Sequence, residues 1–134
     1  MQVDRDFDVL IVGGGIAGLY LLYRLRGIGL SALAFEAGPN VGGTWYWNRY
    51  PGARCDVDSV DYQFSFSDEL QRGWTWKERY AEQPEILSYL QYVADTLDLK
   101  QDIQFETRVD MTSNKFNLLS FNYMHLNEIL RMLL

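Results

Sequence analysis

Three glycines near the amino terminus have the spacing of a loop that binds dinucleotides. Residues 13–18 read GGGIAG, which gives G-x-G-x-x-G at Gly13, Gly15 and Gly18. In such a loop the first glycine permits a tight turn, the second lets a pyrophosphate approach the backbone, and the third lets a helix pack closely on a sheet. The free N–H groups and positive dipole end of that helix then bind the phosphates. The spacing therefore predicts a pyrophosphate site.

Glu36 supplies the second feature of a dinucleotide site, about 18 positions beyond Gly18. At the end of a strand, its carboxylate can accept hydrogen bonds from both hydroxyls of an adenosine ribose, and it would repel a 2′-phosphate. This favours FAD or NAD over NADP, although the spacing does not distinguish FAD from NAD. The alternative is a Gly-rich turn with a solvent-exposed Glu at a strand end.

These residues need a strand, a helix and a second strand to position them. Residues 7–12 form a short apolar, β-branched run that ends at the glycines, which predicts a buried parallel strand. Residues 16–26 carry apolar side chains at helical spacing around most of the circumference, and Gly27 and Gly29 supply a helix stop. Residues 30–35 predict the second strand. The pattern is a βαβ unit, so the fold class is α/β with a parallel sheet.

The rest of the chain predicts an irregular middle and one long helix. Residues 41–61 are dense in Gly, Pro, Arg, Asp and aromatics without a period, which indicates an ordered loop. Residues 62–67 alternate aromatic and polar, as in a short strand or an extended segment. Residues 84–99 begin with a proline and carry an apolar helical stripe. Residues 103–109 alternate as a strand, and a further helix is expected near 126–134.

Composition excludes several classes of function. A formal net charge of −6 over 134 residues argues against a nucleic-acid binder. The longest uncharged run, residues 9–23, is about 15 residues long, short of the roughly 20 that a membrane span needs. Cys55 and His125 are the single cysteine and histidine, so neither an internal disulfide nor a His/Cys zinc site is expected. We expect a cytoplasmic protein without a metal, whose redox chemistry comes from an organic cofactor.

The glycine pair Gly42-Gly43 and the aromatic string that follows it carry a resemblance to one family. Residues 44–56 read TWYWNRYPGARCD, a run of rare residues in fixed order. The run resembles the Baeyer–Villiger monooxygenases of the phenylacetone and cyclohexanone monooxygenase kind. The resemblance covers roughly residues 5–109 and continues at Tyr62, Phe64–Ser67, Trp74, Arg79-Tyr80 and Gln83–Ile86.

The resemblance implies FAD and NADPH as cofactors, and a ketone and O2 as substrates. In this family the reduced flavin and O2 form a C4a-peroxyflavin, which inserts oxygen into the ketone. Asp56 is implied to be catalytic, because it holds an arginine over the flavin that lies beyond residue 134 in full-length members. The residues implied to contact the cofactors are Gly13, Gly15, Ile16, Gly18, Glu36, Gly43, Thr44, Trp45, Tyr46, Trp47, Arg54, Cys55, Asp56 and Tyr62.

Simpler interpretations stand beside these roles. Trp45 and Trp47 are at a density at which aromatics often belong to a core. Arg54 and Asp56 are close enough in sequence to form a local surface ion pair, worth at most about 1 kcal/mol. Cys55 has no basic neighbour that would activate a thiol, so we expect a small buried side chain rather than a nucleophile.

The end of the chain departs from the family. We expect residues 1–110 to be the N-terminal part of a FAD-binding domain and residues 111–134 to be an atypical tail. The second G-x-G-x-x-G for NADPH and the family's signature segment with His, Trp and Pro are not found in this sequence. The Rossmann-type FAD-binding domain is therefore expected to be incomplete. The alternatives are a catalytically inactive FAD-binding fragment and an N- or S-oxygenating flavin monooxygenase.

Overall fold

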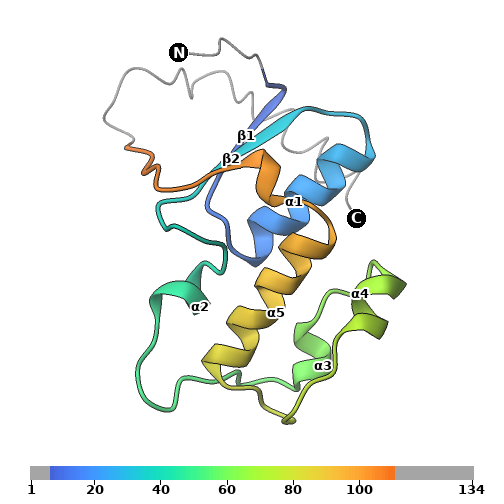
Figure 1. Ribbon diagram of the computed structural model, residues 1–134, viewed down its shortest axis with the longest axis vertical. Helices are drawn as coiled ribbons and strands as arrows, with labels where there is room; N and C mark the ends of the chain where they lie inside the picture. Colours follow the sequence, from blue (N-terminus) through green and yellow to red (C-terminus); the bar gives the residue numbers. More distant parts are fainter. Residues whose placement is uncertain (1–6, 111–134) are drawn as a thin grey trace.

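The computed structural model describes residues 7–110, in which helices pack on a small parallel sheet (Figure 1). The strands pair in parallel in the order β1-β2-β3, so the predicted βαβ unit and the α/β class are confirmed. The elements are β1 (Val9–Val12), α1 (Ile16–Gly27), β2 (Ala32–Phe35), α2 (Thr44–Trp47), α3 (Ser59–Tyr62), α4 (Asp68–Gly73), α5 (Gln83–Thr96), the 3-10 turn η1 (Lys100–Asp102) and β3 (Ile103–Gln104).

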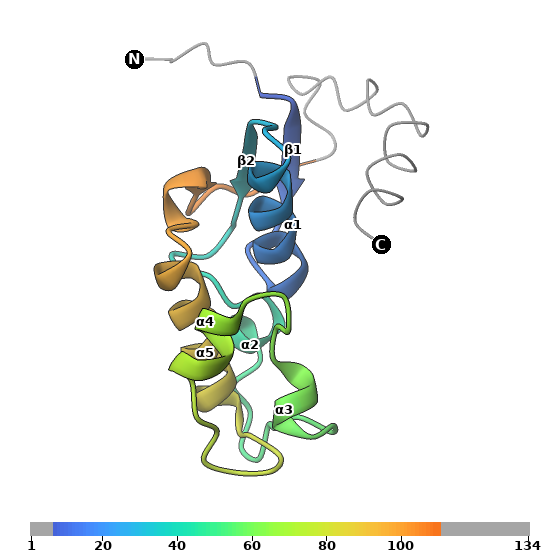
Figure 2. The same cartoon turned by 90° about the vertical axis from the view of Figure 1, so that its right-hand side faces the viewer.

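The main core lies where α1 and α5 pack together on one face of the sheet (Figures 1 and 2). α1 is apolar around much of its circumference, as its sequence predicts, because it contacts both the sheet and α5. No helix within residues 7–110 is long and apolar enough to cross a bilayer. The buried residues of this core are Ile11, Leu19, Leu22, Leu25, Ala34, Val41, Leu70, Tyr89, Leu90, Val93, Ala94, Leu99 and Ile103.

β1 is covered on one face only, so the prediction of a fully buried strand is wrong for the described residues. Ile11 is 6% exposed and faces the core, whereas Leu10 and Val12 are 36% and 64% exposed. Side chains alternate between the two faces of a strand, so Leu10 and Val12 share the open face. The apolar run at β1 reflects a strand with two apolar faces, of which residues 7–110 cover one.

The strands are shorter than their sequence patterns. β1 begins at Val9, and just before it the Asp8 carboxylate accepts from the Ser31 N–H at 2.8 Å and from the Ser31 hydroxyl at 2.7 Å. These hydrogen bonds lower the pKa of Asp8. β3 ends at Gln104 because Glu106 adopts φ +53° and turns the chain across the end of β2.

The middle of the chain contains more helix than its sequence predicts. The region expected to be a loop, residues 41–61, contains α2 and the start of α3, and α4 follows an extended segment at 63–67. Helices of four to six residues are too short to show a helical period, which explains the omission. α5 spans 83–96 rather than 84–99. The helix expected near 126–134 lies outside the described residues.

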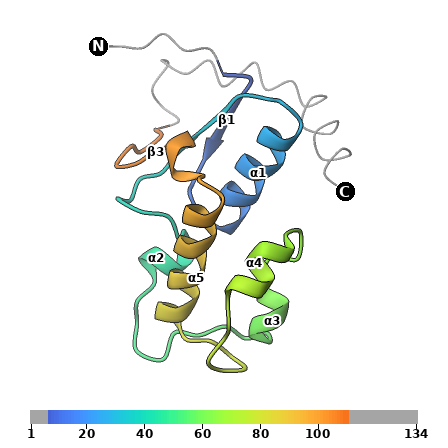
Figure 3. The same cartoon turned by 45° about the vertical axis from the view of Figure 1, so that its right-hand side comes forward.

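α5 connects the two ends of the molecule. Its carboxyl-terminal half packs under the sheet, while α2 lies on one side of its amino-terminal half and α3 and α4 on the other (Figures 1 and 3). Arg26, in the last turn of α1, donates hydrogen bonds to the carbonyl oxygens of Leu97 and Asp98 at 2.8 and 2.9 Å, which joins the carboxyl ends of both helices. The segments that follow β2 are therefore supported by α5.

Candidate functional site

Backbone conformation at Gly13 and close packing at Gly18 both favour glycine where β1 turns into α1. Gly13 adopts φ +103°, in the left-handed region that favours glycine. A Cβ atom at Gly18 would lie 2.1 Å from the Gly13 carbonyl oxygen, so the helix can pack this closely on the turn only with glycine. A Cβ atom at Gly15 would lie 3.3 Å from the Cα atom of Gly43. All three glycines of the motif therefore lie in one compact turn.

The amino terminus of α1 offers unpartnered N–H groups. No side chain caps it at Gly15, and its first turn contains no acidic residue. The first N–H groups of any helix have no partner within the helix, and they carry the positive end of its dipole. Because α1 is 12 residues long, this end of the helix is suited to bind an anion such as a pyrophosphate.

Glu36 is buried beside this turn, at 4% exposure, so the alternative of a solvent-exposed Glu is wrong. Its two carboxylate oxygens accept hydrogen bonds from the backbone N–H groups of Gly14 at 2.6 Å and Gly38 at 2.7 Å. An ionised carboxylate has about four acceptor positions, so these two bonds leave capacity for ribose hydroxyls. Sequence reasoning missed Gly14 and Gly38, which act through their backbone.

The second glycine pair joins α2 to the turn. The N–H of Gly42 donates to the Gly14 carbonyl at 3.0 Å, and Gly43 adopts φ +52° to start α2. A Cβ atom at Gly43 would lie 2.8 Å from the Cα atom of Gly15. The two glycine motifs are thus in direct contact, and α2 begins immediately beside the first one.

The two tryptophans of α2 differ, since one is packed and the other is exposed. The indole N–H of Trp45 donates to the Tyr62 hydroxyl at 2.8 Å, and Trp45 packs against both hydrophobic clusters of the protein. Trp47 is 59% exposed, so it is not a core residue, and its ring lies edge-on to that of Tyr46 at 5.0 Å. Thr44, at the start of the helix, is exposed.

Arg54, Cys55 and Asp56 lie on the segment that precedes α3. Arg54 forms ion pairs with Glu82 at 2.7 Å and Glu78 at 3.5 Å, so the alternative of a local Arg54–Asp56 pair is wrong. Cys55 is buried at 4% exposure, as expected of a small packed side chain. Asp56 is exposed.

Neighbouring charges hold this segment in place. Asp58 accepts a hydrogen bond from the Arg79 side chain at 2.9 Å, which lowers the pKa of Asp58 and raises that of Arg79. The Ser59 hydroxyl lies 2.9 Å from the Glu78 carbonyl oxygen and 3.0 Å from that of Arg79, and donates its one hydrogen to either. The segment from 53 to 59 is thereby fixed against residues 78–83.

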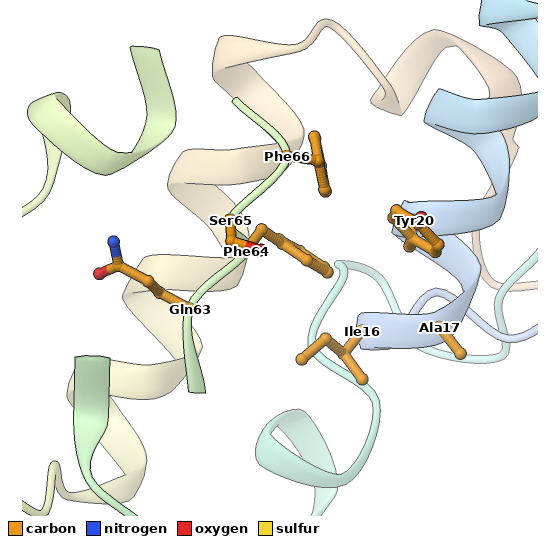
Figure 4. A pocket seen from close by; sticks show the side chains of 7 residues that line it. All are labelled: Ile16, Ala17, Tyr20, Gln63, Phe64, Ser65 and Phe66. Carbon is orange, nitrogen blue, oxygen red and sulfur yellow. The ribbon is translucent and has the colours of Figure 1, made fainter. Parts of the chain in front are cut away.

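An open pocket of about 360 Å³ adjoins the first turn of α1 (Figure 4). Tyr20, Phe64 and Phe66 point toward one another across it, and their rings lie 5.0 to 6.2 Å apart. The pocket provides a mainly apolar surface next to the glycine turn. Its remaining lining residues are Ile16, Ala17, Gln63 and Ser65.

These groups fit an FAD dinucleotide. The uncapped end of α1 suits the pyrophosphate, the buried Glu36 carboxylate suits the ribose, and the glycines allow close approach of both. Residues 7–110 contain no group of three His, Cys, Asp or Glu side chains that could hold a metal ion. All of the cofactor contacts implied by the family resemblance, and the catalytic role implied for Asp56, stay predictions.

Comparison with known sequences points to the same chemistry. The model of the NAD(P)-binding Rossmann-like domain family matches residues 11–77, half of the chain. The phenazine N-monooxygenase of Lysobacter antibioticus is 49% identical over 113 residues, which cover 81% of this chain and 21% of that protein. A Baeyer-Villiger monooxygenase of Pseudooceanicola batsensis is 49% identical over 109 residues, covering 81% and 20%. The chain thus spans about a fifth of the length of these relatives.

Solved structures agree with the sequence matches. An oxidized steroid monooxygenase bound to NADP superposes with a TM-score of 0.75 at 63% identity, over 77% of this chain and 20% of that one. The OTEMO complex with FAD and NADP superposes with a TM-score of 0.72 at 41% identity, over 77% and 19%. In both comparisons this chain matches a small part of a much longer protein.

Proposed function

We propose that this chain, which belongs to the NAD(P)-binding Rossmann-like domain family, is the FAD-binding N-terminal portion of an NADPH-dependent Baeyer–Villiger monooxygenase. The observation that carries the proposal is the buried Glu36 carboxylate beside the uncapped amino terminus of α1. Its relatives include monooxygenases at about half sequence identity, one of which, at 46%, is named an FAD-binding monooxygenase. The proposed substrates of the whole protein are a small ketone and O2, and the proposed location is the cytoplasm.

Each residue of the site has a proposed task. Glu36 accepts hydrogen bonds from the ribose hydroxyls, and the N–H groups after Gly15 bind the pyrophosphate. Trp45, held by Tyr62, covers the cofactor from α2. Bound FAD supplies the redox chemistry. Asp56 is exposed and positions an arginine that, in full-length members of the family, lies beyond residue 134.

The experiment that tests this proposal is titration of the purified chain with FAD, followed by NADPH in air. We expect the flavin absorbance band to sharpen and flavin fluorescence to fall as FAD binds. Failure to bind FAD at any concentration would contradict the assignment of this site to FAD. Bleaching of the bound flavin by NADPH would show that the chain is competent in flavin reduction, whereas a stable band identifies a binding portion that needs the rest of the protein.

N-oxygenation is a second candidate for the whole protein, and it is favoured by the 49% identity to a phenazine N-monooxygenase. The two candidates differ in whether the transferred oxygen acts as an electron donor or as an electron acceptor. They therefore differ in the substrate that they oxidise. A full-length homologue that contains residues 7–110 should convert cyclic ketones to lactones if the first candidate holds. Conversion of an aromatic N-heterocycle to its N-oxide, with no product from ketones, would select the second.

A further inference from the structure

α2 is a helix that cannot be stable by itself. It has four residues, and the hydrogen bonding of a single helical turn does not compensate the conformational entropy that is lost when the turn forms. It must therefore be held by contacts at its ends. At its carboxyl end, the Thr44 carbonyl accepts from the Asn48 N–H at 2.9 Å, and the Tyr46 carbonyl accepts from the Arg49 side chain at 2.8 Å. Both of these partners are near neighbours in sequence.

The Trp45 carbonyl has a partner from a distant element. The side-chain amide of Gln83, the first residue of α5, donates to it from 38 positions further along the chain. Gln83 is itself fixed, because it is 7% exposed and its backbone N–H donates to the Ala53 carbonyl at 2.8 Å. A buried, backbone-anchored amide thus connects α5 with α2.

The other end of α2 lies against the glycine turn. The Cα atom of Gly43 is within 3.3 Å of where a Gly15 Cβ atom would be, and Gly42 is bonded to Gly14. A small rotation of α2 would therefore change the space above Gly15. The bonds from Asn48 and Arg49 would not oppose such a rotation, since both residues would move with the helix.

We propose that Gln83 is a positioning residue, which holds α2 so that Gly43 and Trp45 keep the dinucleotide site open to FAD. The inference rests on the proposed function of this site. The Trp45 indole is held independently by Tyr62, so Gln83 controls the main chain of α2 and Tyr62 controls the ring. Loss of the amide should loosen α2 without unfolding the core, because the buried apolar residues of α5 begin at Ile86.

The test replaces the amide by groups of similar size. In Gln83→Glu the ionised carboxylate cannot donate to the Trp45 carbonyl, whereas the protonated form at acidic pH can. Gln83→Met lacks a donor at every pH. The matched control is Gln71→Glu, because the Gln71 amide donates to the Ser65 carbonyl at 2.8 Å, away from α2. Two quantities are measured: hydrogen exchange of the Asn48 N–H, and the dissociation constant for FAD.

At neutral pH we expect exchange at Asn48 to be about tenfold faster in Gln83→Glu and Gln83→Met, and FAD binding about tenfold weaker. At acidic pH, after correction for intrinsic exchange, Gln83→Glu should return to the wild-type rate and Gln83→Met should not. Gln71→Glu should match the wild type throughout. This acid rescue is the readout that general destabilisation would not produce.

The outcomes separate this inference from the proposed function. Unchanged exchange at Asn48 in Gln83→Glu would overturn the inference, as would an increase shared equally by the amides of α1. Normal FAD affinity in Gln83→Glu and Gln83→Met, with FAD bound by the wild type, would also overturn the inference and leave the function intact. A wild-type chain that binds no FAD would overturn both.

Discussion

Glu36 affects both the stability of the fold and, in the proposed function, the binding of FAD. Its carboxylate accepts from Gly14 and Gly38, and a neutral amide in its place would present an NH2 group to one of these N–H donors. We therefore expect Glu36→Gln to lower the free energy of unfolding by about 1–3 kcal/mol, since one buried N–H loses its partner. FAD binding should weaken as well. Urea denaturation and flavin titration measure the two effects.

The control for Glu36 is Glu69→Gln in the exposed first turn of α4, which should change the free energy of unfolding by less than about 0.5 kcal/mol. Equal effects of the two substitutions would show that the hydrogen bonds of Glu36 do not stabilise the fold.

Two glycines of α1 form a matched pair for a packing test. A Cβ atom at Gly18 would lie 2.1 Å from the Gly13 carbonyl oxygen, whereas one at Gly27 would have no atom within 4 Å. We expect Gly18→Ala to destabilise the protein by about 1–3 kcal/mol, or more if the turn cannot shift, and to abolish FAD binding. Gly27→Ala should be neutral or stabilise by up to about 1 kcal/mol. Urea denaturation of both variants checks this, and similar midpoints would contradict it.

The residues of the site differ in how far the sequence could predict them. Gly13, Gly15, Gly18 and Glu36 form a local pattern whose spacing indicates a dinucleotide-binding turn, so they could be predicted together. Gly38 could not, because it contributes only a backbone N–H group. Long-range partners carry no signal along the sequence, which is why the ion pairs of Arg54 with Glu78 and Glu82 and the bond from Gln83 to Trp45 required the structure.

Among the elements, length decides what the sequence can predict. α1 and α5, of 12 and 14 residues, are long enough for their apolar spacing to be visible. α2, α3 and α4 are four to six residues long and are held by contacts with α5 and with the segment at 78–83, not by their own periodicity. β3 is shorter than its sequence predicts, again because a tertiary contact decides where the element ends. The Glu106 N–H donates to the Gly38 carbonyl and redirects the chain.

The one-sided covering of β1 can be tested with adjacent residues. Ile11 is 6% exposed in the core and Val12 is 64% exposed on the open face. Truncation of a buried isoleucine removes both apolar burial and packing, so Ile11→Ala should lower the free energy of unfolding by about 2–5 kcal/mol. Val12→Ala should lower it by less than about 1 kcal/mol. Thermal or urea unfolding measures both. A comparable loss in Val12→Ala would mean that the second face is also covered.

At the scale of the whole molecule, Tyr89 joins the parts that are distant in sequence. It is completely buried on α5, and its hydroxyl accepts from the Phe64 N–H at 2.7 Å. Its ring lies 4.9 Å from that of Trp76 and 5.5 Å from that of Trp74. The segment that lines the pocket beside α1 is thus anchored to the helix that also supports α2. Because Tyr89 is buried at this position, ionisation of its phenol should destabilise the fold.

Burial raises the pKa of Tyr89 to about 12 from its usual value, because the folded protein disfavours the phenolate. A folded-state pKa above that of the unfolded chain means that the associated stability is complete below about pH 10 and falls as the pH rises through about 12. The loss over this window should be about 2–3 kcal/mol. It is measured as the decrease of the urea midpoint with pH, with tyrosinate absorbance recorded in parallel.

A phenylalanine at position 89 separates the titration from the packing. Tyr89→Phe leaves the Phe64 N–H without its acceptor, so it should cost about 1–3 kcal/mol at neutral pH, yet its urea midpoint should fall less steeply between pH 10 and 12. Tyr50→Phe, at a side chain that is 65% exposed, should retain the full alkaline loss of the wild type. If Tyr89→Phe loses stability as steeply as the wild type above pH 10, another group causes the alkaline unfolding.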